Sequence, residues 1–140
     1  ANFGVVDRVR LQGPHQATTV NLDLFARIDI LLDTAPVSGM NDVAEALWMG
    51  VPVVSLKGDR RAGCMGAAIL DAANRADWAA ATADDYVAIA AALADAADLT
   101  ETRAGLRDAL SASPLRDAKG LAQALKTALA ARAKRAAQPA

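Results

Sequence analysis

Between residues 18 and 56 the sequence alternates helical and strand patterns with short connections, and this alternation narrows the choice of fold more than any other feature. The stretches "IDILLDT" at residues 28–34 and "VPVVSL" at residues 51–56 are nearly continuous apolar runs, as expected of strands covered on both faces. Residues 18–27 and 41–49 have helical patterns; Asn41 or Asp42 can cap the second helix, and Gly50 is expected to end it. Buried strands joined through helices pair in parallel with right-handed crossovers. The sequence therefore predicts an α/β fold, a parallel sheet with Rossmann-like packing, followed by C-terminal helices.

Further strands and one helix are predicted around this unit. "VRLQG" at residues 9–13 has a strand pattern that ends in a Gly-Pro turn. A glycine-containing loop after Leu56 leads into a helix over residues 62–74, and a short strand is expected around Trp78. We therefore expect residues 1–78 to form a truncated parallel sheet.

The remainder of the chain is helical by pattern. One helix is capped at Thr82, a second starts at Thr100, and a last one covers residues 115–135. Three leucines at helical spacing in the last helix share a face, which predicts that this helix packs against something; they are Leu121, Leu125 and Leu129. We expect residues 79–135 to pack on the sheet as helices, giving one domain in total that is a fragment of a longer chain.

Composition excludes several classes of function. Acidic and basic residues nearly cancel, with a net charge of −1, so no electrostatic argument favours nucleic acid or an anionic membrane as partner. The single cysteine, Cys64, excludes an internal disulfide and agrees with a reducing cytoplasm. The start "ANFGVVDRVRL" has no signal-peptide pattern, and no apolar run is long enough to cross a bilayer. No metal-ligand spacing is present, so no metal or cofactor is expected.

The stretch "DTAPVSGMNDVAEALWMGVPVVSLKG", residues 33–58, holds the candidate site. Ligands of parallel α/β sheets bind beyond the carboxyl ends of the strands, where free N–H groups at a helix start attract phosphate. Glu45 lies about one turn inside the helix, where its carboxylate can accept hydrogen bonds from the two hydroxyls of a ribose; the alternative is an ordinary solvated glutamate. We expect the acid to face outward to the ligand and its apolar neighbours to face the core. The candidate phosphate contacts are Ser38, Gly39, Met40, Asn41 and Asp42.

Several motifs together resemble a known family. "EALWMGVPVV" is similar to the E-A-[L/M]-x-x-G-x-P-V-V pattern of GT-B glycosyltransferases, in which the acid binds the ribose of the donor. "ARIDILLDTAPVSG", "GAAIL" and "ASPLRDA" follow in the order and spacing of the carboxyl-terminal region of protein O-GlcNAc transferases, a group that includes the plant SPINDLY proteins and bacterial relatives. The resemblance runs from about Phe3 to Ala128 and implies the carboxyl-terminal half of a GT-B enzyme.

The resemblance implies a function and also shows where this chain departs from the family. Members transfer a sugar, usually from UDP-GlcNAc, to Ser or Thr hydroxyls of an acceptor protein. They usually carry His at the position of Asn21 and a run rich in His and Thr where this chain has Met40, Asn41 and Asp42. The other lobe, with the acceptor surface, and the tetratricopeptide repeats expected before it are absent, so we expect no transfer by this chain alone and assign no catalytic residue.

Three functions remain open on the sequence. The first is donor binding in a protein O-glycosyltransferase that uses UDP-GlcNAc or another nucleotide-sugar, the second a non-catalytic α/β module for protein interaction, and the third a nucleotide-binding domain unrelated to sugar transfer. Two further residues near the proposed site are His15 and Lys57. Each could contact phosphate or could have an ordinary surface role. Asp33, at a strand end, is expected to hold the loop by accepting backbone N–H bonds.

Overall fold

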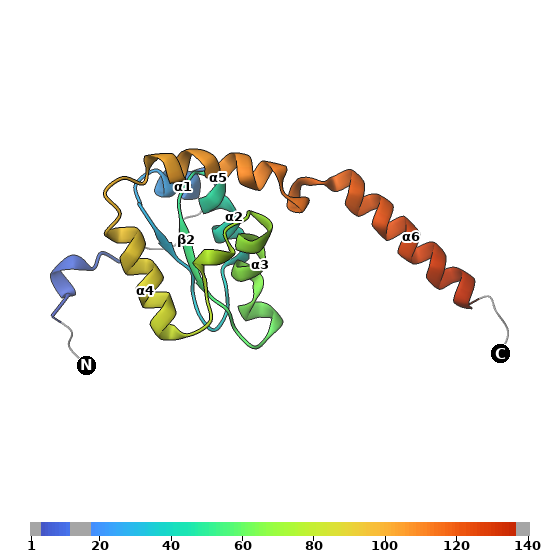
Figure 1. The fold of residues 1–140 in the computed structure, drawn as a ribbon, viewed down its shortest axis with the longest axis horizontal. Helices are drawn as coiled ribbons and strands as arrows, with labels where there is room; N and C mark the ends of the chain where they lie inside the picture. Colours follow the sequence, from blue (N-terminus) through green and yellow to red (C-terminus); the bar gives the residue numbers. More distant parts are fainter. Residues whose placement is uncertain (1–3, 12–17, 137–140) are drawn as a thin grey trace.

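The computed structural model describes residues 4–11 and 18–136, with the side chains of residues 18–21, 134 and 136 left outside the description. A small parallel sheet lies between helices, and one long helix extends away from this body (Figure 1). The sheet has the order β1-β2-β3, with β1 at Leu31–Leu32, β2 at Val53–Leu56 and β3 at Ala79–Ala80. Leu31 pairs with Val53 and Ser55 pairs with Ala79, both in parallel. The predicted parallel α/β fold is confirmed.

Six helices accompany the sheet within the described residues. Helices α2 and α3 pack together on one face of the sheet, α4 covers the other face, and α5 packs on α2 (Figure 1). Their bounds are α1 Thr18–Phe25, α2 Met40–Trp48, α3 Met65–Ala72, α4 Ala83–Ala94, α5 Thr100–Ala112 and α6 Ala118–Ala136. Short 3-10 turns lie at Val6–Arg8, Arg61–Gly63, Ala76–Trp78 and Pro114–Arg116.

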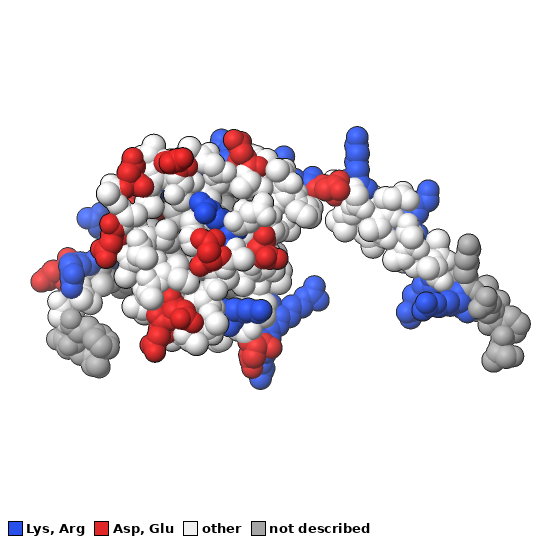
Figure 2. All heavy atoms as spheres, in the orientation of Figure 1, with Lys and Arg blue, Asp and Glu red and all other residues white. Residues whose placement is uncertain are grey.

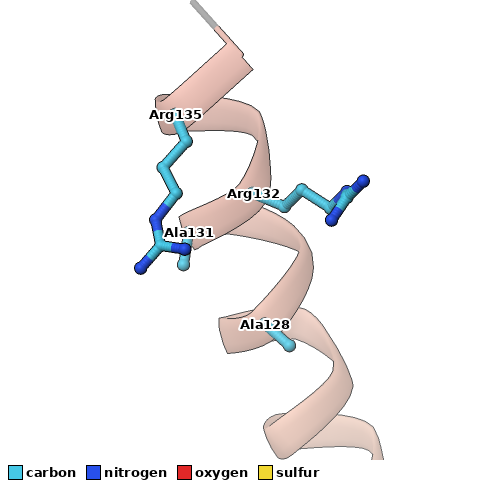
Figure 3. A pocket seen from close by; sticks show the side chains of 4 residues that line it. All are labelled: Ala128, Ala131, Arg132 and Arg135. Atoms are coloured by element: carbon cyan, nitrogen blue, oxygen red, sulfur yellow. The ribbon is translucent and has the colours of Figure 1, made fainter.

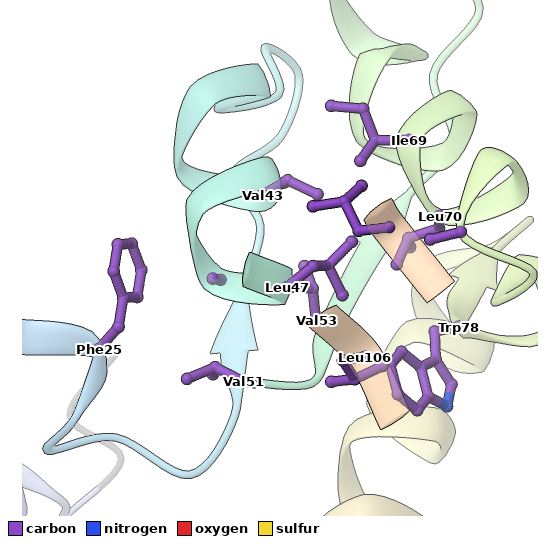
Figure 4. Close-up of a cluster of buried hydrophobic side chains, with 12 residues drawn as sticks. Phe25, Val43, Leu47, Val51, Val53, Ile69, Leu70, Trp78 and Leu106 are labelled. Atoms are coloured by element: carbon purple, nitrogen blue, oxygen red, sulfur yellow. The ribbon is translucent and has the colours of Figure 1, made fainter. Parts of the chain in front are cut away.

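The core forms where α2, β2, α3 and α5 meet. Leu47, Val53, Leu70 and Leu106 are at most 1% exposed, and Trp78 closes the cluster at its edge (Figure 4). Each comes from a different element, so burial of these larger side chains, rather than of the many alanines, ties the elements together. The polar face of α2 is thereby held at a fixed position relative to the sheet.

Helix ends follow local sequence signals in two of three cases. Thr82 and Asp85 form the capping box that begins α4, as expected of Thr82. Gly50 ends α2 with a φ of +76°, and a side chain there would meet the carbonyl oxygen of Arg103. The prediction that Asn41 or Asp42 caps α2 is wrong, because both lie inside the first turn and Gly39 occupies the cap position without a side-chain bond.

One predicted strand is absent. Residues 9–11 form no strand: Val9 and Leu11 are 59% and 92% exposed, and an extended segment without a neighbour cannot pair its backbone groups. Residues 12 and 13 of that expected strand lie outside the described part.

The expected packing of the last helix on the sheet is also wrong. Helix α6 extends away from the body, because α5 already closes the core with Leu106 and Leu110 and the turn at Pro114–Arg116 leads the chain outward (Figure 1). Within the described residues, no helix is both long and apolar enough to span a membrane.

Candidate functional site

A buried aspartate side chain holds together the loops at the C-terminal ends of the strands. Asp33 follows β1 and accepts hydrogen bonds from the hydroxyls of Ser38 and Ser55, both at 2.6 Å, and from the backbone N–H of Gly39 at 2.8 Å. The Ser38 hydroxyl in turn accepts from the N–H of Gly66 at 2.8 Å. These bonds join the loop after β1 to β2 and to the start of α3, so the predicted role of Asp33 in holding the loop is confirmed.

Two further residues enclose this network. A Cβ atom on Gly66 would run into the Asp33 carboxylate and the hydroxyls of Ser38 and Ser55, so only glycine fits. From α4, the Tyr86 hydroxyl donates to the backbone carbonyl of Asp33 at 2.9 Å. Burial raises the pKa of Tyr86, and the negative charge of Asp33 raises it further.

The loop after β2 lies directly against the loop after β1. The N–H of Ser38 donates to the carbonyl of Ala62 at 3.0 Å. A side chain on Gly63 would meet the carbonyl oxygen of Pro36, so the two backbones approach closely there. The Cys64 thiol donates to the carbonyl of Gly58 at 2.9 Å, which gives this cysteine a structural partner. The two loops therefore form one surface at the start of α2.

Helix α2 presents a polar face on that surface. Val43, Ala46 and Leu47 are buried, whereas Asn41 and Asp42 are exposed and Glu45 is half-buried. Because residues three and four apart share a helix face, the Glu45 carboxylate lies on the same side as Asn41 and Asp42. The expectation that the acid faces outward and its apolar neighbours face the core agrees with this pattern of burial.

The other predicted phosphate contacts already form hydrogen bonds within the protein. The Ser38 side chain is buried with both of its hydrogen bonds internal, and the Gly39 N–H donates to Asp33. Met40 is exposed and its N–H donates to the carbonyl of Ser38. Asn21 lies in α1, but its side chain, like the whole of His15, is outside the described part.

Lys57 was a candidate phosphate contact from the sequence, whereas two arginines on the same loop were not predicted. Lys57, Arg60 and Arg61 are all exposed, and Arg61 adjoins Ala62, which bonds Ser38. Figure 2 shows Lys and Arg side chains gathered at the lower edge of the body, where this loop lies. The signal was a "KGDRR" run after a buried strand, but only the tertiary contact between the two loops brings this run close to the loop that precedes α2.

Two cavities formed by described residues lie apart from the polar face of α2. A cavity of about 540 Å³ is lined by Ala128, Ala131, Arg132 and Arg135, but Figure 3 shows that all four come from α6 alone. A cavity of about 440 Å³ lies between α3 and the sheet beside Lys57. Glu45 lines neither of them. Among the described residues, no group of three His, Cys, Asp or Glu side chains is placed to hold a metal ion.

Comparison with known proteins decides the family. The model of glycosyl transferase family 41 matches residues 25–125, which include the sheet, the Asp33 network and α2. The chain belongs to glycosyl transferase family 41. This membership confirms the resemblance to the carboxyl-terminal region of the O-GlcNAc transferase and SPINDLY group.

Relatives of this family 41 chain include plant and bacterial proteins. It is 34% identical over 109 residues to the probable UDP-N-acetylglucosamine–peptide N-acetylglucosaminyltransferase SPINDLY of Hordeum vulgare, covering 77% of this chain and 12% of that protein. The Arabidopsis thaliana protein of the same name is 32% identical, with the same two coverages. A solved structure of a K341M mutant of Thermobaculum terrenum O-GlcNAc transferase superposes with a TM-score of 0.63 at 39% identity, covering 74% of this chain and 19% of that one.

The family 41 chain thus corresponds to a small part of its relatives. It spans about 12% of the length of the curated proteins. The matched region contains the strands, the two loops and the helix that carry the candidate site, and the solved relative shares this fold.

Proposed function

We propose that this chain is the part of a protein O-glycosyltransferase that binds the nucleotide-sugar donor, with UDP-GlcNAc as the first candidate donor. The family match supports a glycosyltransferase, and the relatives' names specify an N-acetylglucosaminyl donor and a peptide acceptor. The single observation that carries the proposal is the polar face of α2. It places Glu45, Asn41 and Asp42 beyond the carboxyl end of a parallel strand, where ligands of such sheets bind.

Each residue of this face has a proposed role. The Glu45 carboxylate accepts hydrogen bonds from the two ribose hydroxyls. The N–H groups of Asn41 and Asp42, in the first turn of α2, bind the diphosphate, assisted by the positive end of the helix dipole. The cationic loop of Lys57, Arg60 and Arg61 balances phosphate charge. Ser38 and Gly39 hold the loop through Asp33.

Transfer itself needs parts outside this chain. The acceptor protein and any general base would be held by a second lobe, and tetratricopeptide repeats would precede it, as the resemblance implies. The relatives are several times longer than the matched region, which supports this arrangement. We propose that the chain works within such a longer protein in the cytoplasm, without nucleic acid or membrane as partner. No resident cofactor is proposed, because the nucleotide-sugar is a substrate.

A second function is supported by residues at the same surface that depart from the pattern of the family. Asp42 adds a negative charge where a diphosphate would bind, Met40 offers no polar side chain, and the Ser38 hydroxyl is engaged internally. These features fit either a relative that uses another nucleotide-sugar or a non-catalytic α/β module kept for protein interaction. Both alternatives predict weak or absent binding of UDP-GlcNAc.

Calorimetry with the longer protein that contains this chain tests the proposal. We expect saturable binding of UDP, and Glu45→Gln should raise the dissociation constant at least about tenfold, because two hydrogen bonds to a charged acceptor are weakened. Glu101→Gln is the matched control. Glu101 is the only other glutamate, lies exposed on α5, and its replacement should leave the affinity unchanged.

A panel of nucleotide-sugars then separates the two functions. Binding of a different donor with the same dependence on Glu45 would identify a diverged transferase. If no nucleotide binds and no labelled sugar is transferred to protein, donor binding would be rejected and the interaction module favoured.

A further inference from the structure

The strand β2, which lies between β1 and β3, carries a polar side chain in the interior. Val53, Val54 and Ser55 are all fully buried in this strand, and Ser55 is the only one of the three with a hydroxyl. An apolar side chain of similar size would fill the place without removing a hydroxyl from water, so stability alone does not call for a serine here. The Ser55 hydroxyl donates to the Asp33 carboxylate at 2.6 Å, which points to a role in holding that group.

The Asp33 carboxylate links Ser55 to the starts of two helices. One of its oxygens accepts from the N–H of Gly39, the residue at the cap position of α2. The other oxygen, which Ser55 contacts, also accepts from the hydroxyl of Ser38, and this hydroxyl accepts from the N–H of Gly66 in the first turn of α3. The starts of α2 and α3 are therefore both tied to the middle strand through one side chain.

The backbone of Asp33 is held as firmly as its carboxylate. Its N–H donates to the carbonyl of Val54 at 2.9 Å, and its carbonyl accepts from the hydroxyl of Tyr86 on α4 at 2.9 Å. A Cβ atom on Gly66 would overlap three oxygen atoms of this network, so little free space surrounds them. The orientation of the Asp33 side chain is thus fixed by its donors and by close packing.

We propose that Ser55 is a positioning residue for donor binding. It orients the Asp33 carboxylate, which sets where α2 begins and therefore where Glu45 meets the nucleotide-sugar. This inference rests on the proposed function of α2 as a donor site. Ser55 is fully buried and acts only through Asp33.

Loss of the Ser55 hydroxyl would act on the loop that precedes α2. The carboxylate oxygen that it contacts would keep a single donor, the Ser38 hydroxyl, so the carboxylate could turn and weaken its bond to the N–H of Gly39. A loop that samples several positions must be ordered when a ligand binds, and this ordering lowers the affinity. The effect should therefore be confined to the start of α2 and to donor affinity.

Hydrogen exchange without ligand tests the first step. In the longer protein that contains this chain, Ser55→Ala should raise the exchange rates of the amides of residues 38–45 at least about fivefold, measured by mass spectrometry. The amides of α5 should exchange as in the parent, because α5 does not take part in the network. A general loss of stability would instead raise the exchange rates in both regions.

Calorimetry with UDP tests the second step. Ser55→Ala should raise the dissociation constant about three- to tenfold at an unchanged stoichiometry, as expected for the loss of one hydrogen bond to a charged group. Partial unfolding would instead lower the stoichiometry. Ser113→Ala is the matched control, because it removes another buried hydroxyl, bonded to the carbonyl of Leu110 at 2.6 Å at the end of α5. It should leave the dissociation constant unchanged.

A second variant decides the test if Ser55→Ala does not fold. Tyr86→Phe keeps the ring and removes only the bond to the Asp33 carbonyl, so it acts on the same residue from α4. It should raise the exchange of residues 38–45 and the dissociation constant in the same direction, by about twofold or more.

Three outcomes would overturn the proposal. Exchange that rises equally over residues 38–45 and α5 would show a purely structural role. A dissociation constant that Ser55→Ala leaves unchanged, although Glu45→Gln raises it, would reject the positioning role while the donor site stands. A parent protein that binds no nucleotide would reject the donor site and the positioning role together.

Discussion

At the scale of single residues, Asp33 determines the shape of the candidate site. Its buried carboxylate is balanced by two hydroxyls and one N–H from two segments, the loop after β1 and the strand β2, and a buried charge without such donors would be costly. The network fixes the loop after β1, and this loop sets where α2 begins. The position of the Glu45 carboxylate thus depends on a group that need not touch a ligand.

The tight packing around Asp33 gives the first prediction. Gly66→Ala should lower the free energy of unfolding by about 1–3 kcal/mol, because the new methyl group has no room among three polar oxygens. Gly105→Ala is the control, since no atom lies within 4 Å of its Cβ position; it should raise stability by about 0.5–1 kcal/mol. Urea unfolding measures both, and equal effects would contradict the packing argument.

Tyr86 gives a prediction for alkaline pH. Because its pKa is raised in the folded state, the folded chain keeps this proton after the unfolded chain has lost it. The stabilisation is fully present below the ordinary tyrosine pKa of about 10 and is lost as the pH rises through the raised value. Stability should therefore fall more steeply above that pH in the parent than in Tyr86→Phe.

The same shift can be observed directly. Tyr86 is the only tyrosine in the sequence, so phenolate absorbance in a pH titration reports its pKa alone. The midpoint should be higher in the folded chain than in urea. A midpoint unchanged by unfolding would show that neither burial nor Asp33 acts on this hydroxyl.

At the scale of secondary-structure elements, α2 combines two functions on two faces. Val43, Ala46 and Leu47 anchor it in the core, while the opposite face carries the candidate ligand-binding groups. Asp42 in the first turn is favourable for the helix, because a negative charge stabilises the positive end of the dipole. The same charge opposes a bound diphosphate. Helix stability and donor affinity therefore place opposite demands on this position.

Asp42→Asn separates these two demands. The change should strengthen UDP binding by about two- to fivefold, since it removes a repulsion worth about 0.3–1 kcal/mol, and should destabilise the chain by a similar amount. Calorimetry and urea unfolding measure the two effects. Asp108→Asn on α5 is a control for lost charge and should change neither; weaker binding by Asp42→Asn would mean that the carboxylate helps to bind the ligand.

At the scale of the whole molecule, the chain is a closed body with one separate helix. Leu106 and Leu110 of α5 are buried against the body, and Arg107 and Arg116 lie over the ring of Trp48 at 5.2 and 4.9 Å. Beyond Asp117 no comparable burial occurs in the described residues, which end at 136. Folding of the body should therefore not depend on α6.

Truncation tests this independence. A chain that ends at Asp117 should keep its free energy of unfolding within about 0.5 kcal/mol of the parent, measured where both are monomeric, because only exposed side chains are removed. A chain that ends at Asp98 should lose cooperative unfolding, because it lacks Leu106 and Leu110. A large loss on the first truncation would show that α6 packs on the body in solution.

The sequence by itself determined the features that depend on neighbours along the chain. Apolar runs and helical spacing between residues 18 and 56 predicted the parallel α/β unit, Thr82 predicted a cap, and Gly50 predicted the end of α2. The acid among apolar neighbours in this helix, Glu45, was expected on the outer face of α2. These are local effects of backbone geometry and side-chain period, so a stretch of a dozen residues contains them.

Only the tertiary structure decided which polar groups remain available to bind a ligand and which surfaces are covered. Ser38 bonds Asp33 and Gly66, and the loop that carries Arg60 and Arg61 contacts the loop before α2. Residues 9–11 form no strand, and α6 stands apart from the body. Each outcome depends on a partner distant in sequence, such as Ser55 for Asp33, 22 residues away. Hydrogen bonding and burial are settled by such contacts, which no local pattern encodes.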